Sequence, residues 1–523
     1  MAAVHTLEML LALMTAAVML AVIARRLMVP PAAAYTVGGL VLAVTPGVPP
    51  FEIEPALILT LFLPPLLQSS AFFVNWHLFR ANLRPILALA VGAVAFTTLV
   101  VGLVVHALLP DIPLAAGFVL GAIVSPPDAV AASAILQRLR LPRRLVTILE
   151  GESLVNDATG LILYRFGIAA ALSGTFDAGW AATEFAIVAI GGVAVGLGVG
   201  WALMQIGRRL NDTHLEIAVS FLAAWASYIA AERLGVSGVL STVACGITLG
   251  RYRHTVLSSQ TRLEARSTWG FVVFVLEALV FVLIGLSLHG VLGRLGLARI
   301  IELLPLTGWI ILALTLARIG WVYPATYLSS VLWRLTRQQR CTPLAYPTII
   351  AWSGMRGVVS LAAALALPEG FPGRDAILLA TFAVIVVTVL VQGTTLGPLI
   401  RLLGVAEPID RSTEAAVRAA LASEELRLLE ARAEDPLDGA IAHDVLTEAR
   451  TMAAWSGAAA KGSAALTELR TRLSIKLDAM AARRRALITI DRERHLPDTV
   501  LHALEHEMDL EELRLRRRLE AAG

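Results

Sequence analysis

The chain alternates between long apolar stretches and short polar segments. Many of the apolar stretches reach roughly 20 residues, the length with which an α-helix crosses about 30 Å of hydrocarbon. Counted as one helix each, these stretches predict thirteen membrane spans, at 5–24, 31–46, 53–74, 85–109, 114–137, 145–172, 180–207, 215–233, 236–250, 268–290, 303–332, 343–367 and 374–402. The pattern therefore predicts an all-α polytopic membrane protein.

Arginines gather in alternate loops. They follow the odd-numbered spans, whereas the intervening loops hold only Arg233, Arg294, Arg299 and Arg374. Basic residues close to the ends of spans stay preferentially on the cytoplasmic side of a membrane. This bias predicts that the N-terminus lies outside the cell and that the C-terminus lies in the cytoplasm.

The polarity of the chain changes after about Gly404. The later segments, such as "LHALEHEMDLEELRLRRRLEAAG", mix charged residues with leucine at helical spacing. Two domains are expected: a transmembrane domain over residues 1–404 and a cytoplasmic helical tail over residues 405–523. The tail is either a solvated helical bundle or a regulatory domain, and the sequence does not choose between them.

Composition supports the membrane class and excludes others. The chain is 57% hydrophobic and 16% charged, whereas soluble domains are about 25% charged. Its two cysteines, Cys245 and Cys341, form neither a disulfide framework nor a metal-binding spacing. The small positive charge belongs to the loop arginines, so membrane lipid is an expected partner and nucleic acid is not.

Ionisable residues inside the spans are the exceptions that point to function, because an unpaired charge in the bilayer is costly. They are Asp128, Glu150, Glu152, Asp157, Arg165, Glu277, Arg318 and Arg356. Any one of them fits a structural ion pair that fixes helix packing. As a set on neighbouring spans, they indicate an ion-binding site.

The acidic cluster lies in "EGESLVNDATG", residues 150–160. Four-residue spacing places Asp157 and Ser153 on one face of a helix and Glu152 and Asn156 on another. Carboxylate and hydroxyl oxygens suit a hard cation, and a carboxylate also takes a proton. Asp157 is therefore predicted to hold either a cation or a proton.

Two spans carry interruptions. The fifth contains Pro126 and Pro127, and the twelfth contains Gly354 and Gly357 around an arginine. Alone, each fits a proline kink or the close packing of small residues. The two spans are seven apart, and an odd displacement inverts a repeat in the membrane. Paired interruptions in inverted repeats point to a transporter site, so we expect two broken, crossing helices that offer carbonyls and helix-end dipoles.

Arg356 needs a counter-charge, because a guanidinium group does not deprotonate in proteins. Glu152 is the predicted partner, since it can point away from Asp157. The pair Glu152–Arg356 would stabilise the core and leave Asp157 as the titrating group. The roles of Glu277, Arg318 and Arg165 stay open.

Six motifs resemble the monovalent cation:proton antiporter family, which contains the bacterial and eukaryotic sodium/proton exchangers. They occur in family order over about residues 1–404 as "SPPDAVA", "EGESLVNDATG", "LGVSGVLSTVACGITLG", "VFVLIGL", "SGMRGVVSLAAALALP" and "LVQGTTLGPLIRLLG". The tail carries no part of the resemblance.

The resemblance implies a thirteen-span inverted-repeat fold, usually a homodimer in the plasma membrane, that works by elevator-like alternating access. It implies that Asp157 carries the cation and the proton, with Asn156 beside it. It also implies that Asp128 and Ser153 join Asp157 in binding the transported metal ion. The Asn-Asp pair resembles the electroneutral one-for-one branch. Glu152 matches a position near the ion, and Arg356 matches the core arginine.

One motif departs from the family pattern. Members often have Thr-Asp-Pro in the broken span, whereas this chain reads Pro127-Asp128-Ala129. A threonine oxygen is missing there, and Ser125 is the residue expected to supply an oxygen instead.

The expected function is antiport of Na⁺, with Li⁺ or K⁺ as alternatives, against H⁺, in pH homeostasis and without enzyme activity or cofactor. The rivals are a K⁺-selective antiporter, a proton-coupled transporter of an organic solute, a channel and an intramembrane enzyme. A channel needs repeated coordination sites, and the chain has no zinc motif or nucleophile elbow. Aromatic residues make up only 6% of the chain, which favours an inorganic ion over an organic solute.

Overall fold

The computed structural model describes residues 2–27, 29–43, 45, 55–128, 139, 141–174, 177–210, 212–335, 343–405, 411–434, 443–447, 449–450, 463–494 and 498–522. Within these residues every regular element is a helix, as expected. The chain divides into two compact units, Met1–Ala406 and Glu407–Gly523.

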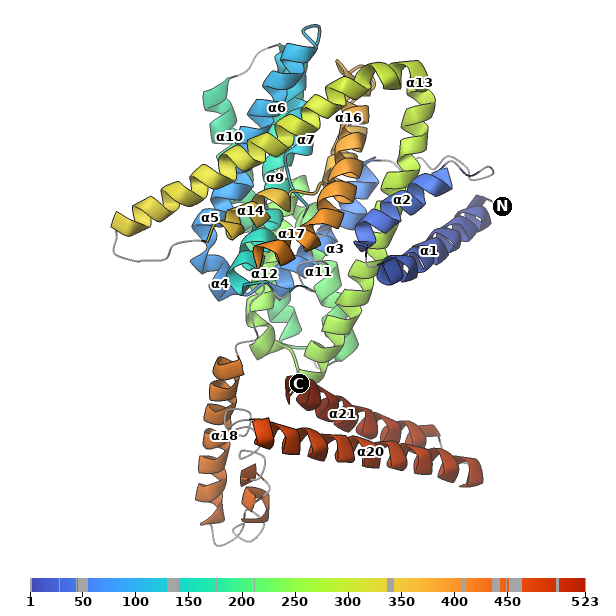
Figure 1. Ribbon diagram of the computed structural model, residues 1–523, viewed down its shortest axis with the longest axis vertical. Coiled ribbons are helices and arrows are strands. Elements are labelled where there is room, and N and C mark those ends of the chain that lie inside the picture. Colours follow the sequence, from blue (N-terminus) through green and yellow to red (C-terminus); the bar gives the residue numbers. More distant parts are fainter. Residues whose placement is uncertain are drawn as a thin grey trace. The chain divides into compact units, whose positions relative to one another are not determined.

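Figure 1 shows the helices of the first unit. They are α1 (Ala2–Leu27), α2 (Pro31–Ala43), α3 (Pro55–Phe73), α4 (Trp76–Ala81), α5 (Leu83–Leu87), η1 (Ala88–Ala93), α6 (Val94–Leu108), α7 (Leu114–Val124), α9 (Arg143–Ser173), α10 (Ala178–Gly207), α11 (Thr213–Arg233), α12 (Gly238–Val256), α13 (Ser259–Leu335), α14 (Ala345–Trp352), α15 (Val358–Leu365), α16 (Arg374–Val387), η2 (Thr388–Gln392) and α17 (Gly393–Leu403).

Several of these helices are long and apolar enough to cross a membrane. Six qualify among the described residues: Leu83–Leu108, Gly179–Gly207, Thr213–Arg233, Gln260–Leu286, Ile300–Tyr327 and Arg374–Leu403. Shorter apolar helices cover Pro31–Ala43, Leu59–Phe73 and Leu114–Val124. The protein is therefore an integral membrane protein, while the count of thirteen spans stays a prediction.

Both predicted interruptions fall where a described helix ends. In the fifth predicted span, α7 ends at Val124, and residues 125–128 are not helical. In the twelfth, α14 ends at Trp352 and α15 begins at Val358. The rest of the fifth span, residues 129–138, lies outside the described residues. The interruptions leave free helix ends deep in the unit.

A stripe of small residues joins α10 to α12. The stripe on α10 consists of Gly192, Gly196 and Gly200, spaced by four so that they share one helix face. A Cβ built on Gly196 would overlap the carbonyl oxygen of Ser241, and one on Gly192 would meet that of Ser237. Small residues allow membrane helices to approach at backbone distance, where dispersion contacts replace a hydrophobic driving force.

A second close crossing joins α2 to α13. A Cβ on Gly39 would overlap the carbonyl oxygen of Val282, and one on Gly285 would overlap that of Thr36. α13 itself combines two predicted spans, and Figure 1 shows the sharp turn between its two parts. The backbone leaves helical geometry at Gly296, with φ 70° and ψ 155°. Glycine adopts positive φ without steric cost.

The second unit consists of helices rich in charged residues: α18 (Arg411–Ala433), α20 (Ser463–Arg494) and α21 (Asp498–Ala522). A small apolar cluster of Met480, Leu487 and Met508 joins α20 to α21. The ion pair Arg484–Glu512, at 2.9 Å, links the same two helices. The unit therefore contains a helical hairpin with its own small core.

The α2–α13 crossing yields a prediction of stability. Gly285→Leu should destabilise the protein by roughly 1–3 kcal/mol, the usual cost of overpacking, because the added side chain meets backbone atoms that cannot move aside. Gly270→Leu on the same helix is the matched control, since nothing lies within 4 Å of a Cβ at Gly270. Thermal unfolding of both variants in detergent measures the difference, and equal midpoints would contradict the proposed packing.

Candidate functional site

The two interruptions touch one another. The backbone N–H of Asp128 donates to the carbonyl oxygen of Met355 at 2.7 Å. Nε of Arg356 donates to the carbonyl oxygen of Val124 at 2.7 Å, and Nη2 donates to that of Ser125 at 3.3 Å. The unwound segments of the fifth and twelfth predicted spans therefore cross in direct contact.

Helix α9, which carries the acidic cluster, packs against this crossing. A Cβ on Gly160 would overlap the ring of Pro126, so the glycine permits close approach. The side-chain amide of Asn156 donates to the carbonyl oxygen of Pro127 at 2.6 Å. Asn156 therefore gives a donor to a carbonyl of the non-helical segment that follows α7.

Asp157 is enclosed but unpaired. Its exposed fraction is 8%, and no described residue forms a hydrogen bond or ion pair with its carboxylate. Asp128 is close enough to repel it electrostatically. A buried carboxylate without a partner needs either a proton or a cation.

The neighbouring oxygens differ in availability. Oδ1 of Asn156 is buried and has no donor in the structure. The Ser125 hydroxyl, in contrast, donates to the carbonyl oxygen of Gly121 and pairs with the Thr98 hydroxyl at 2.9 Å. One lone pair of Ser125 remains, because a hydroxyl oxygen has two. Ser153 is half-buried one turn before Asp157.

Asp128 lies at the start of a half-helix. A Cβ on Gly357, the N-cap of α15, would overlap the Asp128 carboxylate, so the two groups are in contact. The N-terminal end of a helix carries a partial positive charge that favours an anion. The glycine at 357 thus allows the carboxylate to reach a helix end.

The predicted ion pair Glu152–Arg356 is not formed, although the two charges are close enough to interact. Glu152 pairs with Arg318 of α13 through two parallel bonds, Nη1–Oε1 at 2.7 Å and Nη2–Oε2 at 3.0 Å. Both side chains are buried, at 2% and 4% exposure. The forked geometry matches a guanidinium to a carboxylate. An arginine does neutralise Glu152, as expected, but it is Arg318 from the eleventh predicted span and not Arg356 from the twelfth.

Arg356 is instead surrounded by carbonyl oxygens. Its guanidinium donates to Val124 and Ser125, at the C-terminal end of α7, and to Gly354. Arg318 likewise donates to the carbonyl oxygen of Ile350 in the last turn of α14, at 3.0 and 3.2 Å. The last carbonyls of a helix lack intrahelical donors and carry partial negative charge. Each arginine therefore neutralises the C-terminal end of one half-helix.

Gly354 separates these two cations. A Cβ there would lie 2.7 Å from Cδ of Arg318 and 2.7 Å from Nη1 of Arg356. The Arg356 N–H also donates to the Thr388 hydroxyl at 3.1 Å. Thr388 and Arg318 are residues whose contacts the sequence did not reveal, since a lone threonine or arginine in an apolar span does not indicate its partner.

The structure also gives contacts for Glu277 and Arg165, whose roles the sequence left open. Glu277 of α13 is close enough to Asp128 and Tyr35 for electrostatic interaction. Arg165 of α9 pairs with Glu232 of α11 at 2.9 Å, with 53% and 33% of the side chains exposed. The first belongs to the acidic surroundings of Asp128, and the second joins α9 to a helix outside the crossing.

The chain is similar in sequence to known proteins. A family model described as "Sodium/hydrogen exchanger, transmembrane" matches residues 13–402. A Mycobacterium tuberculosis protein described as an uncharacterised sodium/proton exchanger is 32% identical over 98% of this chain and 96% of its own length. A Bacillus subtilis protein named as a sodium, potassium, lithium and rubidium/proton antiporter is 34% identical over 66% of this chain and 54% of its own.

The fold is also shared with a solved structure. The sodium proton antiporter MjNhaP1 from Methanocaldococcus jannaschii, determined at pH 8, superposes with a TM-score of 0.61 at 19% identity. The match covers 77% of this chain and all of that one. Together with the crossing of broken helices beside an acidic cluster, these matches show that the chain belongs to the sodium/hydrogen exchanger family of secondary antiporters.

Proposed function

We propose that this protein exchanges Na⁺ for H⁺ one for one, with Asp157 carrying either ion. The observation that carries this proposal is the buried Asp157 carboxylate, which has no partner among the described residues at the crossing of two interrupted helices. The same carboxylate binds a cation when deprotonated and excludes it when protonated. That competition couples the two flows.

The oxygens around Asp157 form the proposed cation site. Asp128 and Ser153 contribute oxygen ligands together with Asp157. Oδ1 of Asn156 is a buried acceptor without a donor among the described residues. Ser125 contributes its remaining lone pair. Oxygen ligands of this kind suit hard cations. The transported ions are the only small molecules that the cycle needs, so it requires no resident cofactor.

Cation selectivity is proposed as Na⁺ first, with Li⁺ and K⁺ as alternatives. The name of the Bacillus subtilis relative includes four alkali cations, which supports a site that tolerates more than one size. A K⁺-selective antiporter is the runner-up. A proton-coupled transporter of an organic solute is a weaker candidate, because buried side chains fill the crossing.

The assembly is proposed from the loop arginines and the family resemblance. The protein has thirteen spans in the plasma membrane, with the N-terminus outside and the C-terminus in the cytoplasm, and works as a homodimer by alternating access. The second unit is cytoplasmic and is either a solvated helical bundle or a regulatory domain. The exchange serves pH homeostasis.

The Asp157 assignment predicts loss of exchange without loss of fold. Asp157→Asn should reduce Na⁺-driven proton flux in reconstituted vesicles to the level of protein-free vesicles. Its thermal stability should be equal or higher, because the substitution removes a buried charge that has no partner. Wild-type flux should persist when valinomycin and K⁺ clamp the membrane potential. Exchange that survives in Asp157→Asn would move the carrier role to Asp128.

Shared use of one carboxylate predicts a specific pH dependence. Once the protonated form of the site predominates, the apparent KM for Na⁺ should rise about tenfold for each unit by which the pH is lowered. The reason is that one proton displaces one cation. The maximal rate at saturating Na⁺ is the internal control. Initial rates measured over a matrix of pH and Na⁺ test this, and a KM independent of pH would refute it.

The ion pair is assigned a structural role. Glu152→Gln leaves the buried Arg318 uncompensated and should cost about 3–5 kcal/mol of stability. Glu232→Gln, which breaks the partly exposed pair with Arg165, should cost about 1 kcal/mol or less. The double variant Glu152→Gln/Arg318→Gln should recover part of the loss. Thermal unfolding in detergent measures all three, and equal costs for the two single variants would contradict the assignment.

A further inference from the structure

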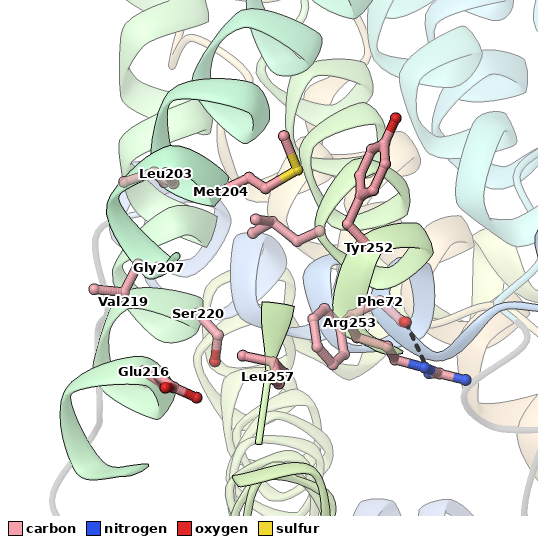
Figure 2. A pocket seen from close by; sticks show the side chains of 11 residues that line it. Phe72, Leu203, Met204, Gly207, Glu216, Val219, Ser220, Tyr252, Arg253 and Leu257 are labelled. Atoms are coloured by element: carbon pink, nitrogen blue, oxygen red, sulfur yellow. Dashed lines mark hydrogen bonds between the residues drawn. The ribbon is translucent and has the colours of Figure 1, made fainter. Parts of the chain in front are cut away.

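A second site lies in the first unit, on helices that carry none of the residues around Asp157. It is a pocket between the ends of α3, α10, α11 and α12, and it is partly open to its surroundings (Figure 2). Most of its walls are apolar, with Met204 from α10, Val219 from α11 and Leu249 and Leu257 from α12.

One acidic group faces this apolar space. Glu216 lies in the first turn of α11 and is only 7% exposed. Its Oε2 is buried, and nothing in the structure donates a hydrogen bond to it. Figure 2 shows the carboxylate at the α11 side of the pocket. The helix start offsets part of its charge, but an unpaired buried carboxylate remains costly.

The other polar groups of the pocket already have partners. Arg253 donates from Nη1 to the carbonyl oxygen of Phe72 at 3.2 Å, and its guanidinium lies over the ring of Phe73. Figure 2 shows this guanidinium on the opposite side of the pocket from Glu216. Ser220 donates to the carbonyl oxygen of Ile217 and accepts from Nε1 of Trp269. Among the described polar groups that line the pocket, Glu216 is therefore the one whose charge would be stabilised by a bound cation.

We propose that this pocket binds an alkylammonium group, with the ammonium on Glu216 and the alkyl chain along the apolar walls. An inorganic cation would need several oxygens, whereas the walls offer mainly carbon. An anion would be repelled by the carboxylate, and a neutral chain would leave it unpaired. An ammonium on an apolar chain satisfies both features of the pocket.

The location suits two sources of such a group. The pocket lies at the last turns of α10 and α12 and the first turns of α11, and Arg208, Arg209 and Arg251 flank these helix ends. Arginines at span ends mark the depth of lipid headgroups. The ammonium therefore comes either from an aminophospholipid or from a free amphipathic amine, and both share the chemistry that Glu216 recognises.

The test uses purified full-length protein in a non-ionic detergent, with octylammonium as the probe and 1-octanol as its uncharged match. Octylammonium should raise the thermal unfolding midpoint of the wild type in a saturable way. Glu216→Gln should weaken its apparent affinity at least tenfold. Glu184→Gln, on α10 outside the pocket, should leave the affinity unchanged, as should Asp157→Asn, which separates this site from ion exchange.

Three results would overturn the proposal. They are equal stabilisation by octanol and octylammonium, an octylammonium response unchanged in Glu216→Gln, and a response to Na⁺ or K⁺ alone that Glu216→Gln removes. If Glu216→Gln does not yield folded protein, Leu249→Trp replaces it, because a larger side chain fills the pocket and should abolish binding without altering the carboxylate.

Native mass spectrometry distinguishes the two sources. Protein incubated with phosphatidylethanolamine or with phosphatidylglycerol is compared for retained lipid. Retention of phosphatidylethanolamine that Glu216→Gln loses assigns the site to an aminophospholipid. Equal retention of both lipids, with octylammonium still dependent on Glu216, assigns it to a free amine. Either result supports the proposed chemistry.

Discussion

Everything at the core of this protein depends on neutralising free helix ends where water is scarce. An interrupted helix leaves carbonyls without donors, and in a bilayer each such group costs several kcal/mol. Arg356 meets this demand at the end of α7, and Arg318 meets it at the end of α14. Two buried cations then need their own compensation and separation. Glu152 supplies the charge, and Gly354 gives both guanidinium groups room.

This arrangement explains why neighbouring acids on one helix behave differently. Glu152 and Asp157 lie five residues apart on α9, and so on different faces. The first is held by two hydrogen bonds from Arg318 and is fixed in position. The second has no such bonds in the described structure and lies near another carboxylate, Asp128. The electrostatic demands of the crossing are met without Asp157, which leaves its charge free to change.

The sequence predicted what depends on local chemistry and not what depends on distant partners. Pro126 and Gly354 break helices by their own backbone properties, so the interruptions were predictable, as was the acidic cluster between them. The arginine that pairs with Glu152 could not be predicted. Helical spacing shows which face of α9 carries the glutamate, but it does not identify a neighbour 166 residues away. Glu216 was missed for another reason. An acidic residue in the first turn of a helix is common, and only the surrounding pocket makes this one unusual.

The long helix α13 has a mechanical consequence. It consists of two helical rods, one on each side of Gly296. Gly296 is the only residue within 259–335 with non-helical dihedral angles. The first rod is fixed to α2 at Gly285, and the second carries Arg318. The dihedral angles of this one glycine therefore set the direction in which the second rod leaves the α2 crossing, and so where Arg318 meets Glu152.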